Sequence, residues 1–215
     1  LDGRLVLRDD GVPATAGRVL ETAALVERLI KAGYHKATDN GKGMKASVYR
    51  KLWPKTVVQP LAYVDRFDEL LLVDHTIAIP ELVRMANFYL YIQPEACDDL
   101  VPAPLGKDGQ PVSRYLAFVQ LGKKNLNRTI EECRKSFALD EVGLVTVEGL
   151  HLPIQHESYL RQYAVDLSAS AYDGVRAPYV DWFADALPRF DADGVRHSYP
   201  LCGSASRGSE IIILS

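Results

Sequence analysis

Apolar residues recur every three or four positions between Val19 and Ile30, with charged residues filling the positions between them. This spacing predicts an amphipathic helix, which Thr15 is placed to cap at its start and Gly33 to end. Four shorter helices are predicted, over residues 47–53, 81–86, 129–136 and 140–147. Because two of these five helices lie within the first 53 residues, we expect an N-terminal helical piece.

Short apolar runs rich in β-branched and aromatic residues predict strands. They lie at residues 5–7, 56–58, 61–64, 70–73, 88–92, 115–121, 163–167 and 179–183. The run at 88–92 is apolar on both faces, which places it inside a sheet. Asp173-Gly174 and the turn at 191–194 each predict a hairpin, the second with a return strand over 195–199. The wholly apolar run 211–214 predicts a central strand.

This order of elements predicts an α+β fold, with the N-terminal helical piece packed on a mixed, mostly antiparallel sheet in the C-terminal half. Residues 94–111 are rich in proline and glycine and predict a long loop, which is a connector, a linker or a lid. A chain of 215 residues is long enough for one large domain. We therefore expect a single domain over residues 1–215, with subdomains at 1–93 and 112–215 as the alternative.

Net charge, the length of apolar runs and the cysteine pattern make several classes of function unexpected. The net charge of −3 gives no overall positive field, so nucleic-acid binding is not expected. No apolar run reaches the length of a membrane span. Three cysteines without a CxxC motif favour a reducing, cytoplasmic compartment over a disulfide framework. The first residue is Leu1, so whether a segment precedes it stays open.

The stretch from His197 to Glu210 carries the densest group of reactive side chains. Cys202 and His197 are a candidate catalytic pair, because a thiolate nucleophile needs a base or a positive neighbour. Backbone N–H groups at Gly203 and Ser204 are placed to bind an oxyanion, and Asp193 or Glu210 is the candidate carboxylate that orients the pair. The alternative is a half-buried structural cysteine at a strand end.

The same stretch offers a second kind of site, in which Arg207 and small hydroxyl side chains bind a phosphate or a carboxylate. The candidate ligand-binding residues are Arg207, Ser204, Ser206 and Glu210. The alternative is a polar turn, since glycine and serine are common turn residues. The spacing from Gly203 to Gly208 is one residue too long for the Gly-x-Ser-x-Gly motif of serine hydrolases.

Other motifs are incomplete. Gly41-Lys42-Gly43 lacks the spacing of a phosphate-binding loop. His151 and His156 are five residues apart across a proline, so they do not share a helical face, and no metal site is predicted. We expect both histidines to be solvated loop residues.

Carboxylates and aromatic residues cluster in the last third of the chain. The carboxylates are Asp166, Asp173, Asp181 and Asp185, and two of them are candidates for a general acid and base. The aromatic residues are Tyr159, Tyr163, Tyr172, Tyr179, Trp182 and Phe183. They form either a groove for a ligand or partner, or a sheet core with tyrosines at its rim.

Three motifs are shared with a known family. They are the Leu-Asp-Glu-Val-Gly-Leu-Val-Thr stretch at 139–146, the late Gly-Ser-Ala-Ser at 203–206, and the Leu-Ile-Lys-Ala-Gly-Tyr stretch at 29–34. The chain resembles, best over residues 112–207, an actinobacterial family of uncharacterised proteins. It departs from the family in the position of Gly143 and in the Arg-His-Ser-Tyr approach at 196–199. The resemblance implies a domain extent and no chemistry.

Two functions follow from these observations. The first is a cytoplasmic binding or protein-interaction module that uses the aromatic face of the last third. The second is a small-molecule hydrolase or transferase with Cys202, His197 and Arg207 at its site. The expected partner is a protein or a small anionic ligand, and the sequence assigns neither a cofactor nor an oligomeric state.

Overall fold

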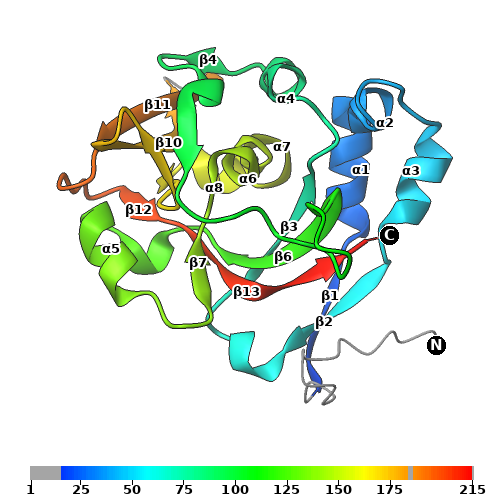
Figure 1. Ribbon diagram of the computed structural model, residues 1–215, viewed down its shortest axis with the longest axis horizontal. Coiled ribbons are helices and arrows are strands. Elements are labelled where there is room, and N and C mark those ends of the chain that lie inside the picture. The colour runs from blue at the N-terminus through cyan, green and yellow to red at the C-terminus, as the bar shows by residue number, and fades with distance from the viewer. Residues whose placement is uncertain (1–15, 184–185, 215) are drawn as a thin grey trace.

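The computed structural model describes residues 16–183 and 186–214. The predicted strand at 5–7 and the predicted cap at Thr15 lie outside these residues. The fold is α+β, and its sheets are mostly antiparallel and lie mainly in the C-terminal half, as predicted. Figure 1 shows the three N-terminal helices, within residues 23–52, at one end of the molecule and the long strands β10 (Arg176–Phe183) and β11 (Leu187–Gly194) at the other.

One four-stranded antiparallel sheet, here called the core sheet, runs through the middle of the molecule. In spatial order its strands are β3 (Glu69–Asp74), β6 (Arg114–Gln120), β13 (Ser206–Ile213) and β7 (Glu141–Gly143). β3 and β6 are buried along nearly their whole length, which explains their continuous apolar sequence. β13 pairs with strands on both sides only at Ser206 and Arg207, because Gly208 pairs with β7 alone and Ile211–Ile213 pair with β6 alone.

A second sheet, here called the cavity sheet, is built from shorter strands. Its main order is β12 (Cys202–Ser204), β8 (Ala164–Asp166), β10 (Arg176–Phe183), β11 (Leu187–Gly194) and β4 (Tyr89–Leu90), with β9 (Ser170–Tyr172) and β5 (Cys97–Asp99) at its side. The β12–β8 and β11–β4 pairs are parallel, and the others are antiparallel. Along β11, Phe190 and Ala192 are buried, while Asp191 and Asp193 point to the opposite face.

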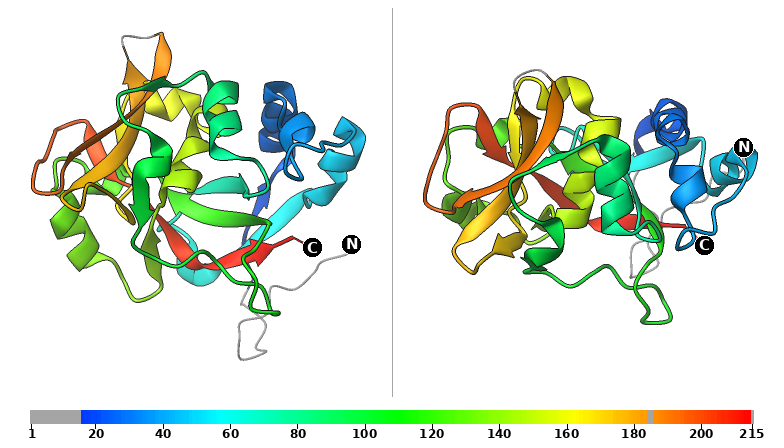
Figure 2. Two further views of the ribbon diagram at one scale, coloured as in Figure 1. Left: turned by 45° about the horizontal axis from the view of Figure 1, so that its top comes forward. Right: turned by 90° about the horizontal axis from the view of Figure 1, so that it is seen from above.

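The N-terminal region combines a ribbon with helices. β1 (Ala16–Glu21) pairs antiparallel with β2 (Thr56–Pro60). α1 (Ala23–Ala32), α2 (Tyr34–Ala37) and α3 (Ala46–Leu52) lie together at one end of the molecule in both views of Figure 2. Gly33 ends α1 with a φ of 99°, as predicted.

The prediction of a helix from Val19 onward is wrong for its first turns. Val19 and Leu20 lie in β1 opposite Val58 and Val57, and the helix begins only at Ala23. Val19 is 62% exposed, so its apolar character does not mark a buried helical face. Pairing with β2, a tertiary interaction, overrides the apparent helical spacing.

The remaining helices lie between and around the two sheets. They are α4 (Ile79–Ala86), α5 (Ile130–Ser136), α6 (Thr146–Leu150), α7 (Leu152–Gln155) and α8 (Glu157–Leu160), with 3-10 turns at Leu61–Tyr63, Pro94–Ala96 and Lys123–Asn125. α6 contacts both β3 and β10, so it joins the core sheet to the cavity sheet. Thr129 caps α5 in a reciprocal capping box with Glu132.

Four further predictions are corrected. Residues 61–64 include a 3-10 turn in place of a strand, and residues 140–147 contain β7 and the start of α6 in place of one helix. Only Tyr89 and Leu90 of the 88–92 run form a strand, and it lies at a sheet edge. The expected turn at 191–194 belongs to β11, and residues 195–199 form no strand.

Candidate functional site

A cavity of about 350 Å³ lies against the polar face of the cavity sheet. Strands β8, β10, β11 and β12 supply one wall, and the segment 197–201 with Arg128 and Ile130 supplies the other. The side chains that carry the argument below are Asp166, Tyr179, Asp181, Arg189, Asp193, His197, Tyr199 and Cys202. A cavity of this size, with a few convergent polar groups, is typical of a small-molecule site.

Strand register brings these groups together from distant parts of the sequence. Asp166 of β8 lies opposite Tyr179 of β10 and also opposite Ser204 of β12. Tyr179 lies opposite Asp191, and Asp181 lies opposite Arg189. Because residues directly opposite on paired strands point to the same face, the sequence places one row of polar side chains across four strands.

Asp166 lies deepest in this row and is only 5% exposed. Its Oδ1 accepts a hydrogen bond from the Cys202 thiol at 2.9 Å, and its Oδ2 is 3.5 Å from the Ser204 hydroxyl. Burial raises the pKa of the Asp166 carboxyl to about 6, and the two hydrogen bonds offset only part of that effect. A carboxyl with such a pKa exchanges its proton near neutral pH.

Cys202 lies beside that carboxyl and is partly buried. Burial, and next the negative charge of Asp166, raise the pKa of the Cys202 thiol well above its usual value. The thiol therefore stays protonated at neutral pH and donates a hydrogen bond to Asp166. This environment is opposite to the positive surroundings that activate a nucleophilic cysteine.

His197 lines the same cavity, but its side chain is 63% exposed. Its Nδ1 lies 2.9 Å from Oδ1 of Asp193. The predicted pair of Cys202 and His197 is thus brought to one cavity, where each side chain has a separate carboxyl partner.

The wall formed by β10 and β11 is held by an ion pair. The Arg189 guanidinium donates to both carboxylate oxygens of Asp181, at 2.8 and 2.5 Å. It also lies over the rings of Tyr179 and Phe183, 5.3 and 5.5 Å from their centroids. The ion pair and the ring contacts hold the Arg189 side chain in place against β10.

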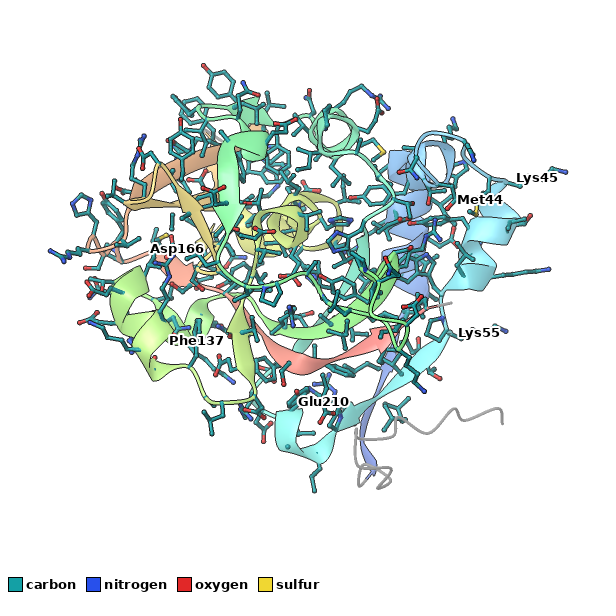
Figure 3. All side chains as sticks on the ribbon, viewed as in Figure 1. Met44, Lys45, Lys55, Phe137, Asp166 and Glu210 are labelled. Atoms are coloured by element: carbon teal, nitrogen blue, oxygen red, sulfur yellow. The ribbon has the colours of Figure 1, made fainter. Side chains whose placement is uncertain are left out.

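The predicted anion-binding residues do not converge on this cavity. Arg207 of β13 is 5% exposed, and its Nε donates to Oε1 of the buried Glu148 on α6 at 2.7 Å. Ser206 is fully buried and donates to Glu141. Figure 3 shows Glu210 and Asp166 in well-separated parts of the molecule. Of the four predicted residues, Ser204 alone contacts a group that lines the cavity, through Asp166.

The structure also separates the predicted carboxylates and aromatic residues. Asp166 and Asp181 share the cavity, Asp173 pairs with Arg176 at a turn, and Asp185 lies outside the described residues. Tyr179 lines the cavity. The Tyr159 and Tyr163 rings contact each other elsewhere, at 5.0 Å between centroids, and Phe183 joins an exposed cluster with Tyr89 and Tyr91.

Sequence reasoning missed Arg189, and it named Asp193 only as one of two carboxylates, with Glu210, that could orient His197; in the structure Asp193 is the one that contacts His197. The signal was present in the alternation of polar and apolar residues from Arg189 to Asp193, which is the period of a half-buried strand. The Asp-Ala-Asp-Gly sequence is also typical of a turn, and a turn prediction takes no account of this alternation.

The two histidines considered for a metal site are buried, contrary to the expectation of solvated loop residues. His151 Nδ1 lies 2.7 Å from the Val147 carbonyl oxygen, and its Nε2 accepts the Asp74 N–H at 3.1 Å. His156 Nε2 lies 2.9 Å from the Leu70 carbonyl oxygen. In residues 16–183 and 186–214, no group of three or more potential metal ligands is arranged around a common point.

These two histidines predict acid sensitivity. Burial lowers the pKa of His151 and of His156 to about 4, so the unfolded chain binds more protons than the folded chain between pH 6.5 and 4. Stability is therefore lost as the pH falls through this window, whereas the raised pKa of Asp166 acts in the opposite direction. We expect urea unfolding to give a free energy about 2 kcal/mol lower at pH 5 than at pH 7. An unchanged value contradicts the neutral buried state of the histidines.

The environment of Cys202 gives a second prediction. Alkylation of Cys202 by iodoacetamide at pH 7.5 is expected to be slow, and Asp166→Asn is expected to accelerate it, because the loss of a negative charge lowers the thiol pKa. Mass spectrometry of the digested protein measures the rate. Cys133 is fully buried and serves as the internal control in the same digest. Fast alkylation of Cys202 in the unmodified sequence would restore the nucleophile hypothesis.

Comparisons with known proteins were made at three levels. Models of protein families, curated proteins and solved structures gave no match to the chain. The resemblance to the actinobacterial family therefore stays a prediction. Across the described part of the chain, no helix has both the length and the apolar character needed to cross a membrane.

Proposed function

We propose that this chain is a binding protein that holds a small polar molecule in the cavity beside Asp166. The observation that carries the proposal is a buried carboxyl facing an open cavity with polar groups from four strands around it. Burying a carboxyl is costly unless it is paired or has a role, so such a group marks a site. The aromatic residues that suggested a protein-interaction face lie in several separate places and do not form one surface. The proposal therefore rests on the cavity.

A second candidate is an enzyme, a hydrolase or transferase, that uses the same cavity. It is favoured by the raised pKa of Asp166, about 6, which suits a general acid or base near neutral pH. In that case Asp166, and not the protonated Cys202, carries the proton transfer. Mass spectrometry of the bound molecule separates the two candidates, because a binding protein returns its ligand unchanged and an enzyme returns a product.

The proposal is tested by filling the cavity. Ala164 lines it from β8, and Ala164→Leu places three additional carbon atoms in its space. A thermal-shift screen of small metabolites is expected to give compounds that stabilise the unmodified protein and not the Ala164→Leu variant. Ala62→Leu, at an exposed 3-10 turn, is the matched control and should keep the shifts. Equal shifts in all three proteins contradict the proposal.

A further inference from the structure

Three carboxylates line the cavity, and two of them have a basic partner. Asp181 is paired with Arg189, and Asp193 with His197. Asp166 has only neutral partners, a thiol and a hydroxyl. Within residues 16–183 and 186–214, no lysine, arginine or histidine nitrogen lies within ion-pair distance of Asp166.

The two arginines that line the cavity are held by other groups. Arg189 makes both of its close contacts with Asp181. Arg128 donates to Oδ1 of Asn125 at 3.1 Å and to the Ser136 hydroxyl at 3.0 Å, beside α5. Like Asp166, Arg128 has only neutral hydrogen-bond partners among the described residues, but those partners lie beside α5, whereas Asp166 is buried in the strand wall. The lining holds three carboxylates against two guanidinium groups, and this excess of negative charge disfavours an anionic ligand.

We infer that the ligand of this cavity is a small organic amine, whose ammonium group binds the Asp166 carboxylate. This inference rests on the proposed function. An ammonium supplies the missing positive charge and a hydrogen-bond donor to the same oxygens. Tyr199 lines the same space as a second aromatic residue beside Tyr179, whose ring already has the Arg189 guanidinium over it, and aromatic rings attract organic cations.

The charged groups around Asp166 set the pH range in which an amine binds. Burial is the largest influence on the Asp166 pKa and raises it, and the hydrogen bonds from Cys202 and Ser204 on β12 lower it. Among the charges, Asp193 on β11 raises the pKa and Arg134 on α5 lowers it. With a pKa of about 6, Asp166 is mostly ionised at pH 7.5 and mostly protonated at pH 5. Amine affinity is therefore expected to weaken as the pH falls from 7.5 to 5, a range in which an alkyl ammonium group stays charged.

The inference is tested with three probes of nearly equal size that differ in charge: benzylamine, benzyl alcohol and benzoate. Each is titrated at pH 7.5 into the ¹⁵N-labelled full chain, and amide shifts are followed by nuclear magnetic resonance. Benzylamine is expected to shift the amides of β8, β10 and β12 and to bind at least tenfold more tightly than either other probe. Asp166→Asn is expected to weaken benzylamine at least tenfold, whereas Asp98→Asn, which removes an exposed carboxylate on β5, leaves its affinity unchanged.

The outcomes separate the ligand class from the proposed function. If benzyl alcohol or benzoate binds as tightly as benzylamine, and Ala164→Leu abolishes that binding, the cavity is a binding site and the amine inference is wrong. If benzylamine binds equally to the Asp166→Asn variant, the inference is also wrong. If none of the three probes shifts these amides, the inference fails. The metabolite screen described above then decides the proposed function by itself.

Discussion

Replacing Arg207 with alanine is expected to lower the free energy of unfolding by about 3–5 kcal/mol, because it leaves Glu148 as an unpaired charge in the protein interior. Glu148 is fully buried, and its Oε1 accepts hydrogen bonds from Arg207 Nε at 2.7 Å and from the Tyr115 hydroxyl at 2.6 Å. Urea unfolding followed by circular dichroism at pH 7 measures the loss.

Two further variants identify the cause of that loss. Arg84→Ala breaks an exposed pair with Glu81 and is expected to cost less than about 1 kcal/mol. Arg207→Met combined with Glu148→Gln removes both charges and keeps an acceptor for the Tyr115 hydroxyl, so it is expected to regain much of the lost stability. A double variant as unstable as Arg207→Ala would mean that packing, and not the unpaired charge, explains the effect.

Replacing Gly203 with alanine is the second large expected effect, a loss of about 1–3 kcal/mol. A Cβ atom at this position would lie 2.2 Å from the carbonyl oxygen of Gly122, which is backbone and cannot rotate away. Gly122 has a φ of 98°, and a Cβ on it would lie 2.3 Å from the Gly203 carbonyl oxygen. The two glycines let β12 lie directly against the chain after β6.

Gly194→Ala is the matched control for this prediction. The atoms nearest to its Cβ would be those of the exposed His197 ring, at 3.2 Å, and a side-chain ring can shift by the few tenths of an ångström required, unlike a backbone carbonyl. The expected change in the free energy of unfolding is within about 0.5 kcal/mol, measured in the same urea titration. Equal losses for the two variants would contradict the steric explanation for Gly203.

Local signals in the sequence identified several elements correctly. The helices predicted over residues 129–136 and 81–86 correspond to α5 and α4, and Gly33 ends α1 as predicted. The buried strands β3 and β6 follow directly from their apolar runs. Each of these signals is contained within a few neighbouring residues, so no knowledge of the fold is needed to interpret it.

The errors lie where distant pairing decides the structure. Residues 141–143 form a strand because they pair with β13, and Gly143 lies there because a Cβ would be 2.3 Å from the Ser168 hydroxyl oxygen. The periodicity of residues 140–147 shows neither the pairing with β13 nor the close approach to Ser168. The candidate site shows the same limit. The sequence alone does not distinguish Asp166 from the three other candidate aspartates, because strand register brings it beside Cys202 and Tyr179.

Ala205 is the single residue between β12 of the cavity sheet and β13 of the core sheet. It is fully buried, its N–H donates to the Asp166 carbonyl oxygen at 3.1 Å, and its carbonyl oxygen accepts the Leu144 N–H at 3.2 Å. With so short a connection, the two sheets are expected to lose their hydrogen bonds in one cooperative unit. A molecule bound beside Asp166 would then slow amide hydrogen exchange in β6 as well as in β8, although β6 belongs to the other sheet.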